Sequence, residues 1–220
     1  MNVIRRKLAI VTGAATDMGL ELGRLCAQLG FDLIIAADEP KIHDAARELG
    51  LMGVTCRPVQ CDLSSNSGFA ALMAAIASGE RPVDFLFANT DCGLGHGILY
   101  EDLDKAMRAI QSSLDGTLRM IFAVAADMRS RGQGCILITS THSGLMSGSF
   151  QALYNGSKTF LDSFCVALGN ELKGSGVTVT SLLPDATPID LFERSTVPRT
   201  RFESLAPQAQ IISPASATRH

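Results

Sequence analysis

Short apolar runs alternate with amphipathic segments along most of the chain, and this alternation restricts the possible folds more than any other feature of the sequence. Such runs fit strands that are buried on both faces, as in a parallel sheet covered by helices. We expect six strands, at 8–11, 33–36, 54–59, 83–88, 135–139 and 177–182. We expect five intervening helices, at 18–29, 41–49, 68–77, 103–128 and 151–172. The alternation predicts right-handed βαβ units and therefore an α/β fold, a doubly wound parallel sheet in three αβα layers.

The length and charge of the chain narrow its organisation and its partners. A chain of 220 residues is enough for one domain and short for two, so we expect a single domain over residues 1–220. A net charge of -3 argues against nucleic acid or a membrane surface as partner, and no apolar stretch is long enough to span a membrane. After Pro184, prolines break the pattern, so residues 184–220 are expected to form an irregular substrate-side flap and tail.

The six cysteines indicate a reducing environment. None of them forms a Cys-x-x-Cys pair, and most lie within apolar periodic segments. We interpret them as core residues of a cytoplasmic protein, and we expect no metal site because the spacing of metal ligands is missing.

A glycine-containing turn joins the first strand to the first helix. It reads Thr-Gly-Ala-Ala-Thr-Asp-Met-Gly over residues 12–19 and resembles the Thr-Gly-x-x-x-Gly-x-Gly turn of the short-chain dehydrogenase/reductase family. The resemblance implies a Rossmann-like fold whose glycines let a dinucleotide pyrophosphate approach free N–H groups at the helix start. The residues implied to bind the cofactor here are Gly13, Ala15, Thr16, Asp17, Met18 and Gly19.

Asp17 stands where the family has the middle glycine of this turn. Aspartate is a good helix N-cap, and in that position its carboxylate would occupy the N–H donors that a phosphate needs. Two like charges about 4 Å apart repel by about 1 kcal/mol in water and by about 4 kcal/mol at an effective dielectric constant of about 20. We therefore expect the affinity for the cofactor to fall by roughly one to three powers of ten.

Tyr154 and Lys158 form the most informative pair in the sequence. Their spacing of four places both side chains on one helix face. A free tyrosine has a pKa of about 10 and is a poor acid–base catalyst at neutral pH, but a nearby ammonium favours the phenolate. The pair resembles the Tyr-x-x-x-Lys signature of the family. The resemblance implies that Tyr154 exchanges a proton with the substrate oxygen, and that Lys158 assists it and holds the nicotinamide ribose.

Two further catalytic positions of the family are altered in this chain. Thr141 lies 13 residues before Tyr154, where the family has a serine that hydrogen-bonds the substrate oxygen, and it keeps the hydroxyl. Ser113 stands where the family has an asparagine, before Leu-Asp-Gly. Because serine is shorter and offers one hydroxyl donor instead of an amide, a water-mediated proton relay there would be weakened or would need another water.

Residues after the second, third, fourth and sixth strands complete the implied cofactor site. Asp38 is placed to bind the hydroxyls of the adenine ribose, which favours NAD over NADP, although it could instead cap the following helix. Asp62 and Leu63 resemble the adenine-contacting pair of the family, with a helix cap as the alternative role for Asp62. Asn89 and Pro184 match the asparagine of Asn-Ala-Gly and the proline of Pro-Gly in the family.

Two functions remain open on these residues. The resemblance implies an NAD-dependent oxidoreductase that acts on an alcohol or ketone and forms a homodimer through the helices at 103–128 and 151–172. Against it, Asp17, Asp91 and Asp185 replace family glycines, and unless they point into water they disfavour a pyrophosphate. The alternative is a non-catalytic binding module that kept the fold and lost the cofactor. A serine hydrolase is not expected, because the Gly-x-Ser-x-Gly motif is missing.

Overall fold

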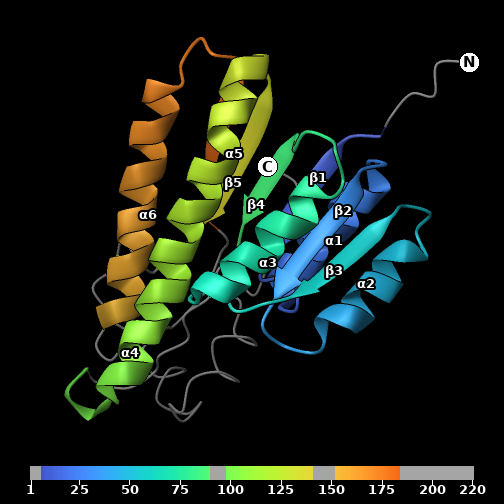
Figure 1. Ribbon diagram of the computed structural model, residues 1–220. Coiled ribbons are helices and arrows are strands. Elements are labelled where there is room, and N and C mark those ends of the chain that lie inside the picture. Colours follow the sequence, from blue (N-terminus) through green and yellow to red (C-terminus); the bar gives the residue numbers. More distant parts are fainter. Residues whose placement is uncertain (1–5, 90–97, 141–151, 184–220) are drawn as a thin grey trace, which may run out of the picture.

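Parallel strands form one sheet in the computed structural model, which describes residues 6–89, 98–140 and 152–183 (Figure 1). The strands are β1 (Leu8–Thr12), β2 (Asp32–Ala37), β3 (Cys56–Gln60), β4 (Phe85–Ala88), β5 (Gly134–Thr139) and β6 (Val177–Leu182). They lie in the order β3-β2-β1-β4-β5-β6, and every neighbouring pair is parallel. This confirms the doubly wound sheet. The order reverses between β1 and β4, and ligands bind at the carboxyl ends of strands at such a switch point.

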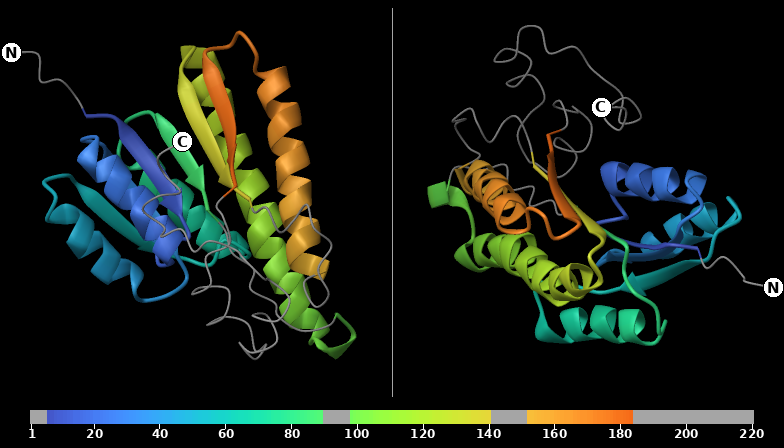
Figure 2. Two further views of the ribbon diagram at one scale, coloured as in Figure 1. Left: turned by 180° about the vertical axis from the view of Figure 1, so that it is seen from behind. Right: turned by 90° about the horizontal axis from the view of Figure 1, so that it is seen from above.

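Helices cover both faces of the sheet and complete the three layers. The helices are α1 (Asp17–Gln28), α2 (Ile42–Gly50), α3 (Asn66–Ala77), α4 (Leu103–Ile110), α5 (Thr117–Arg131) and α6 (Ala152–Glu171), with a short 3-10 turn at Ile98–Tyr100. Helices α1 and α2 lie on one face, whereas α3, α5 and α6 lie on the other (Figure 2). Within the described ranges, none of the helices has both the length and the apolar character needed to cross a membrane.

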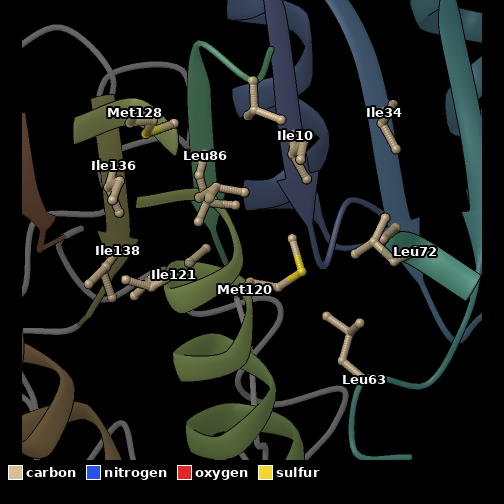
Figure 3. Packing of buried hydrophobic residues seen from close by; sticks show 14 of the residues in the cluster. Ile10, Ile34, Leu63, Leu72, Leu86, Met120, Ile121, Met128, Ile136 and Ile138 are labelled. Carbon is tan, nitrogen blue, oxygen red and sulfur yellow. The ribbon is translucent and has the colours of Figure 1, made fainter. Parts of the chain in front are cut away.

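The core has two parts because alternate residues of each strand point to opposite faces. Ala9 and Val11 of β1 pack towards α1 and α2, and Ile10 between them packs on the side of α3 and α5. Leu86 and Ile136 from the neighbouring strands are fully buried in this second part, beside α5 (Figure 3). Truncating one such side chain to alanine costs about 2–5 kcal/mol in typical cores. Both parts of the core therefore fix the strand ends on which the site is built.

The helix predicted at 103–128 is not a continuous α-helix. It consists of α4 and α5, joined by a π-helical turn at Gln111–Gly116, and α5 continues to Arg131. A π-helical turn adds a residue to one turn without ending the helix, so the apolar pattern runs through it. The turn contains Ser113, which the sequence predicts as a candidate catalytic residue.

Asp32 anchors the amino end of β2, at the opposite end of the strands from the carboxyl ends where ligands bind. Its carboxylate accepts hydrogen bonds from Arg81 Nη1 at 2.8 Å and from the N–H of Thr55 at 2.9 Å. Burial disfavours the charged form of Asp32, but these hydrogen bonds and the charges of Arg81 and Arg6 outweigh it and hold the pKa of the carboxyl below its usual value. The pair ties β2 to the segment that leads into β4.

Candidate active site

Gly13 and Gly19 are required by the packing of the chain on itself. Gly13 has a φ of +62°, and a Cβ at this position would lie 2.2 Å from the carbonyl oxygen of Asn89. A Cβ on Gly19 would lie 2.2 Å from the carbonyl oxygen of Gly13. The sequence interpretation attributed both glycines to the approach of a pyrophosphate. The structure adds a second reason, since the turn cannot close against β4 and α1 with a side chain at either position.

The N-cap of α1 is Thr16, so the prediction that Asp17 caps this helix is wrong. The helix begins at Asp17, and the Thr16 hydroxyl accepts a hydrogen bond from the N–H of Gly19 at 3.1 Å. The same hydroxyl donates to the carbonyl oxygen of Gly13 at 2.8 Å. Asp17 is exposed in the first turn and does not occupy the capping position.

A groove of about 490 Å³, open to solvent, lies at the carboxyl ends of β1, β2, β3 and β4. Its lining residues are Gly13, Ala15, Thr16, Ala36, Ala37, Asp38, Glu39, Cys61, Asp62, Leu63, Asn89 and Ser112. Seven of them were predicted from the sequence for a cofactor, namely Gly13, Ala15, Thr16, Asp38, Asp62, Leu63 and Asn89. The predicted positions Asp17, Met18, Gly19 and Lys158 do not line it.

Five residues of this lining were not predicted from the sequence, and two of them, Glu39 and Ser112, offer side-chain oxygen atoms to a ligand. Glu39 directly follows Asp38 at the end of β2, and this adjacency was the available signal. Ser112 precedes Ser113 in the π-helical turn, whose position the apolar pattern does not reveal. Neither residue belongs to the motifs that resemble the family.

The lining is acidic. It includes Asp38, Glu39 and Asp62, and the lining set contains no lysine, arginine or histidine. Asp38 does not cap the next helix, because α2 begins at Ile42 after Lys41 and has no side-chain cap. This excludes the alternative role weighed for Asp38.

Asp62 has a local structural role at the entrance to α3. Its Oδ1 accepts a hydrogen bond from the N–H of Ser64 at 2.8 Å, while Ser65 is the N-cap of the helix. Just before Asp62, the thiol of Cys61 keeps its proton at neutral pH, since burial, helped by the charges of Asp62 and Asp38, raises its pKa to about 11. The groove therefore holds carboxylates but no thiolate from Cys61.

Asn89 links the glycine turn to β5 through buried hydrogen bonds. Its backbone N–H donates to Thr12 Oγ1 at 3.1 Å. Its side-chain Nδ2 donates to the carbonyl oxygen of Gly13 and to Thr16 Oγ1, each at 3.2 Å. Its Oδ1 accepts from Thr139 Oγ1 at 3.0 Å. Asn89 thus joins the ends of three adjacent strands: β1, β4 and β5.

Tyr154 and Lys158 are both buried in the first turns of α6, at 8% and 3% exposure. Lys158 Nζ lies 5.8 Å from the centroid of the Tyr154 ring. It also donates a hydrogen bond to the carbonyl oxygen of Thr139 at 3.2 Å. The ammonium is therefore held between the tyrosine ring and the carboxyl end of β5.

Ser113 is fully buried in the π-helical turn, and its Oγ lies 3.5 Å from the carbonyl oxygen of Ile110. The turn packs against α6, the helix that carries Tyr154.

Several predictions fall outside the described residues. They concern the predicted site residues Thr141 and Pro184, the aspartates at 91 and 185 that replace family glycines, and the flap at 184–220.

Known proteins that resemble this chain include reductases. A family model described as short chain dehydrogenase matches residues 7–197. Over 180 residues the chain is 31% identical to the very-long-chain 3-oxoacyl-CoA reductase of Neurospora crassa, a match that covers 78% of this chain and 53% of that protein. The chain thus spans about half the length of that reductase.

Solved structures share the fold. A variant of the actinorhodin polyketide ketoreductase with NADPH superimposes with a TM-score of 0.83 at 25% identity, covering 96% of this chain and 87% of that one. Xylitol dehydrogenase bound to NAD+ superimposes with a TM-score of 0.74 at 20% identity, covering 90% and 74% of the two chains. Because the family model spans most of the chain, from the glycine turn through the Tyr-x-x-x-Lys helix, this chain belongs to the short-chain dehydrogenase family of oxidoreductases.

Proposed function

We propose that this protein transfers a hydride between NAD(H) and the carbonyl or alcohol carbon of a small molecule, with Tyr154 as the acid–base group. The observation that carries the proposal is the joint burial of Tyr154 and Lys158 at the carboxyl end of β5. Lysine is rarely buried unless it is paired or has a function, because desolvating its charge is costly. Membership of an oxidoreductase family supports that function.

The groove suits the adenosine half of a dinucleotide that lacks a 2′-phosphate. Asp38 and Glu39 line it at the end of β2, where a carboxylate can accept hydrogen bonds from ribose hydroxyls. A 2′-phosphate beside them would be repelled by about 1 kcal/mol per charge pair at about 4 Å in water, and by more where solvent is excluded. These charges support NAD over NADP as the cofactor. The exposed charge of Asp17 at the start of α1 supports a weakened affinity for either dinucleotide.

The side chains of the protein would position the reactants and move the proton. The nicotinamide, when bound, supplies or accepts the hydride. Tyr154 holds a proton on its phenolic oxygen and donates it to the substrate oxygen during reduction, or removes it from the alcohol in the reverse direction. The ammonium of Lys158 favours the phenolate and offers donors to ribose hydroxyls. Thr141 would donate to the same substrate oxygen, and Ser113 would hold a water that relays the proton.

For the substrate we propose 3-oxoacyl compounds as the first class to test, within the broader class of ketones and alcohols. The proposal is supported by the reductase from Neurospora crassa and by the polyketide ketoreductase structure, both named for ketone reduction. In a 3-oxoacyl thioester the reacting ketone lies close to the thioester end of the acyl chain, which suits a site at the open carboxyl ends of the strands.

Calorimetric titration with NADH and, separately, NADPH tests the proposal first. We expect NADH to bind more tightly than NADPH, and an acetoacetyl thioester to be reduced with loss of NADH absorbance. Tyr154→Phe should lower kcat by roughly two to four powers of ten and leave the Kd for NADH unchanged. Failure of the wild-type protein to bind either dinucleotide at millimolar concentration would contradict the proposal and favour the binding-module alternative.

We also propose that the protein is a cytoplasmic homodimer that pairs through α4, α5 and α6. Phe122, Val166 and Phe160 on these helices are 76%, 66% and 44% exposed. Helices α5 and α6 lie on the same face of the sheet, so these side chains offer an apolar surface to a second copy (Figures 1 and 2).

The proposed cytoplasmic location is supported by the cysteines of the described residues, which are free thiols: Cys26, Cys56, Cys61, Cys135 and Cys165.

A further inference from the structure

We infer that Thr139 is a positioning residue that couples Lys158 to the glycine turn, so that the two ends of the cofactor site are held in one geometry. The consequence for the cofactor rests on the proposed function, whereas the coupling itself belongs to the free protein. Thr139 lies at the end of β5 and is 3% exposed. Neither the glycine turn nor the Tyr-x-x-x-Lys signature includes it.

The first link joins Thr139 to Lys158 through the backbone. The carbonyl oxygen of Thr139 accepts the hydrogen bond from Lys158 Nζ at 3.2 Å, in a buried environment where the ammonium needs an acceptor. The next residue, Ser140, donates its hydroxyl to the backbone carbonyl oxygen of Lys158 at 3.3 Å and its N–H to Leu182 of β6 at 2.8 Å. The contacts of Ser140 to α6 and to β6 thus fix the position of the neighbouring Thr139 carbonyl from two sides.

The second link joins Thr139 to Asn89 through the side chain. Thr139 Oγ1 lies 3.0 Å from Asn89 Oδ1 and 3.4 Å from the carbonyl oxygen of Ala88, and both atoms are acceptors. A threonine hydroxyl has one proton to donate, so the shorter contact receives it. This contact holds the Asn89 amide, whose oxygen faces Thr139 and whose nitrogen faces the glycine turn.

The third link joins Asn89 to Thr16. The Thr16 hydroxyl donates its proton to the carbonyl oxygen of Gly13 at 2.8 Å, so it can only accept from Asn89 Nδ2 and from the N–H of Gly19. An Asn89 amide turned by 180° would place its oxygen against two acceptors. The acceptors of the turn therefore decide which way the Asn89 amide faces, and the hydrogen bond from Thr139 holds that amide in place against the turn.

Thr139→Val tests the coupling, because valine keeps the branched shape and removes the hydroxyl. We expect hydrogen exchange of the Gly19 N–H, measured without cofactor, to become faster by about tenfold, the size expected for one lost hydrogen bond. We expect the Kd for NADH to rise by about the same factor, with a smaller change in the KM for the carbonyl substrate. Thr139→Ser should restore both values, since it keeps the hydroxyl.

The matched control is Ser175→Ala. Ser175 Oγ donates to the carbonyl oxygen of Leu172 and accepts from the N–H of Val177 at 3.3 Å, at the opposite end of β6. Its loss removes hydrogen bonds of a similar kind without touching the three links. It should change neither the exchange of Gly19 nor the Kd for NADH.

A measurement on the wild-type protein needs no variant and serves if Thr139→Val does not fold. The side-chain amide protons of Asn89 should exchange at least about tenfold more slowly than those of the exposed Asn66. Equal exchange at the two amides would overturn the inference.

The outcomes also separate this inference from the proposed function. Faster Gly19 exchange in a folded Thr139→Val protein supports the coupling, even if the wild-type protein binds no dinucleotide, in which case only the proposed function fails. Unchanged Gly19 exchange overturns the coupling, even if the wild-type protein binds NADH tightly.

Discussion

Gly13 packs so closely against Asn89 that a Cβ on Gly13 would lie 2.2 Å from the Asn89 carbonyl oxygen. The backbone of Gly13 is also left-handed, with a φ of +62°. We expect Gly13→Ala to lower the free energy of unfolding by about 2–4 kcal/mol, from the left-handed backbone and the overlap together. Denaturant titration measures this change.

Gly50→Ala is the control for the glycine turn. Gly50 ends α2 with open space around it, so an added methyl group meets nothing within 4 Å. Its stability should stay within about 0.5 kcal/mol of the wild type. A Gly13→Ala protein as stable as Gly50→Ala would show that the turn can open without cost, contrary to the packing described.

Replacing Asp17 should raise the affinity for the cofactor while slightly lowering stability. The exposed carboxylate in the first turn of α1 favours the helix by about 0.3–1 kcal/mol but repels an anionic ligand nearby. Asp17→Asn removes the charge alone, and Asp17→Gly restores the family residue. We expect each to lower the Kd for NADH about fivefold, the equivalent of about 1 kcal/mol. Calorimetry in low and high salt checks this, since the gain should shrink as salt screens the charge. An unchanged Kd in low salt would rule out the electrostatic explanation.

Asp38 should decide between the two nicotinamide dinucleotides. We expect Asp38→Ser to weaken NADH binding and to improve NADPH binding, changing the ratio of the two Kd values by at least about tenfold. Adding Glu39→Gln should move the ratio further in the same direction, because both carboxylates line the groove. Asp44→Ser is the control, since Asp44 is paired with Arg47 on α2 and does not line the groove. A ratio that moves equally in the control would contradict the assignment.

The ion pair between Asp32 and Arg81 should make the free energy of unfolding depend on pH in the acidic range. The folded-state pKa of Asp32 is depressed, so the stability it contributes is present above its unfolded pKa of about 3.9 and is lost as the pH falls through the folded value. We expect Arg81→Met to lower the unfolding free energy at pH 7 by about 1–3 kcal/mol, and by less near pH 3. Urea titrations at both pH values measure the difference.

Arg47→Met supplies the comparison for this pH dependence. The side chains of Arg47 and Asp44 are 77% and 69% exposed, so their ion pair is screened by solvent. We expect little loss of stability at either pH. If Arg81→Met lowers the free energy of unfolding as much at pH 3 as at pH 7, the effect of the substitution does not come from the charge of Asp32.

Phe122 should control association if two copies pair through α5 and α6. We expect Phe122→Glu to shift the protein from dimer to monomer in sedimentation velocity, because a charge would be buried in the interface. Leu51→Glu is the control, since Leu51 is 89% exposed but follows α2, on the other face of the sheet. A wild-type protein that sediments as a monomer would refute the proposed dimer.

The fold was readable from the sequence because the sheet is buried on both faces. Apolar runs then coincide with strands, and β6 has the predicted bounds at 177–182. The start of α1 was missed by one residue because Thr16 and Asp17 are both good caps, and only the position of Gly19 decides between them. The π-helical turn was missed because it changes the hydrogen-bond register without breaking the apolar pattern.

The candidate site was readable where a residue directly follows a strand, as Asp38 and Asn89 do. The sequence could not assign a role to Thr139, because that role depends on a contact with a residue 50 positions away. It also missed Ser112, which reaches the groove from a helix and not from a strand end. Loop residues at strand ends follow from topology, whereas side-chain contacts between distant elements do not.

The pairing of β1 with β4 has a consequence for folding kinetics. Ala9 pairs with Phe85 across 76 positions of sequence, whereas Ala9 and its partner Leu33 in β2 are only 24 apart. Bringing distant segments together costs chain entropy and slows folding, so the switch point should form after the local β1–β2 unit. A dinucleotide bound there would stabilise the native pairing by mass action, by about 2.7 kcal/mol at 100 times its Kd. The ligand would thus stabilise the strand pair whose partners lie farthest apart in the sequence among the pairs of the described sheet.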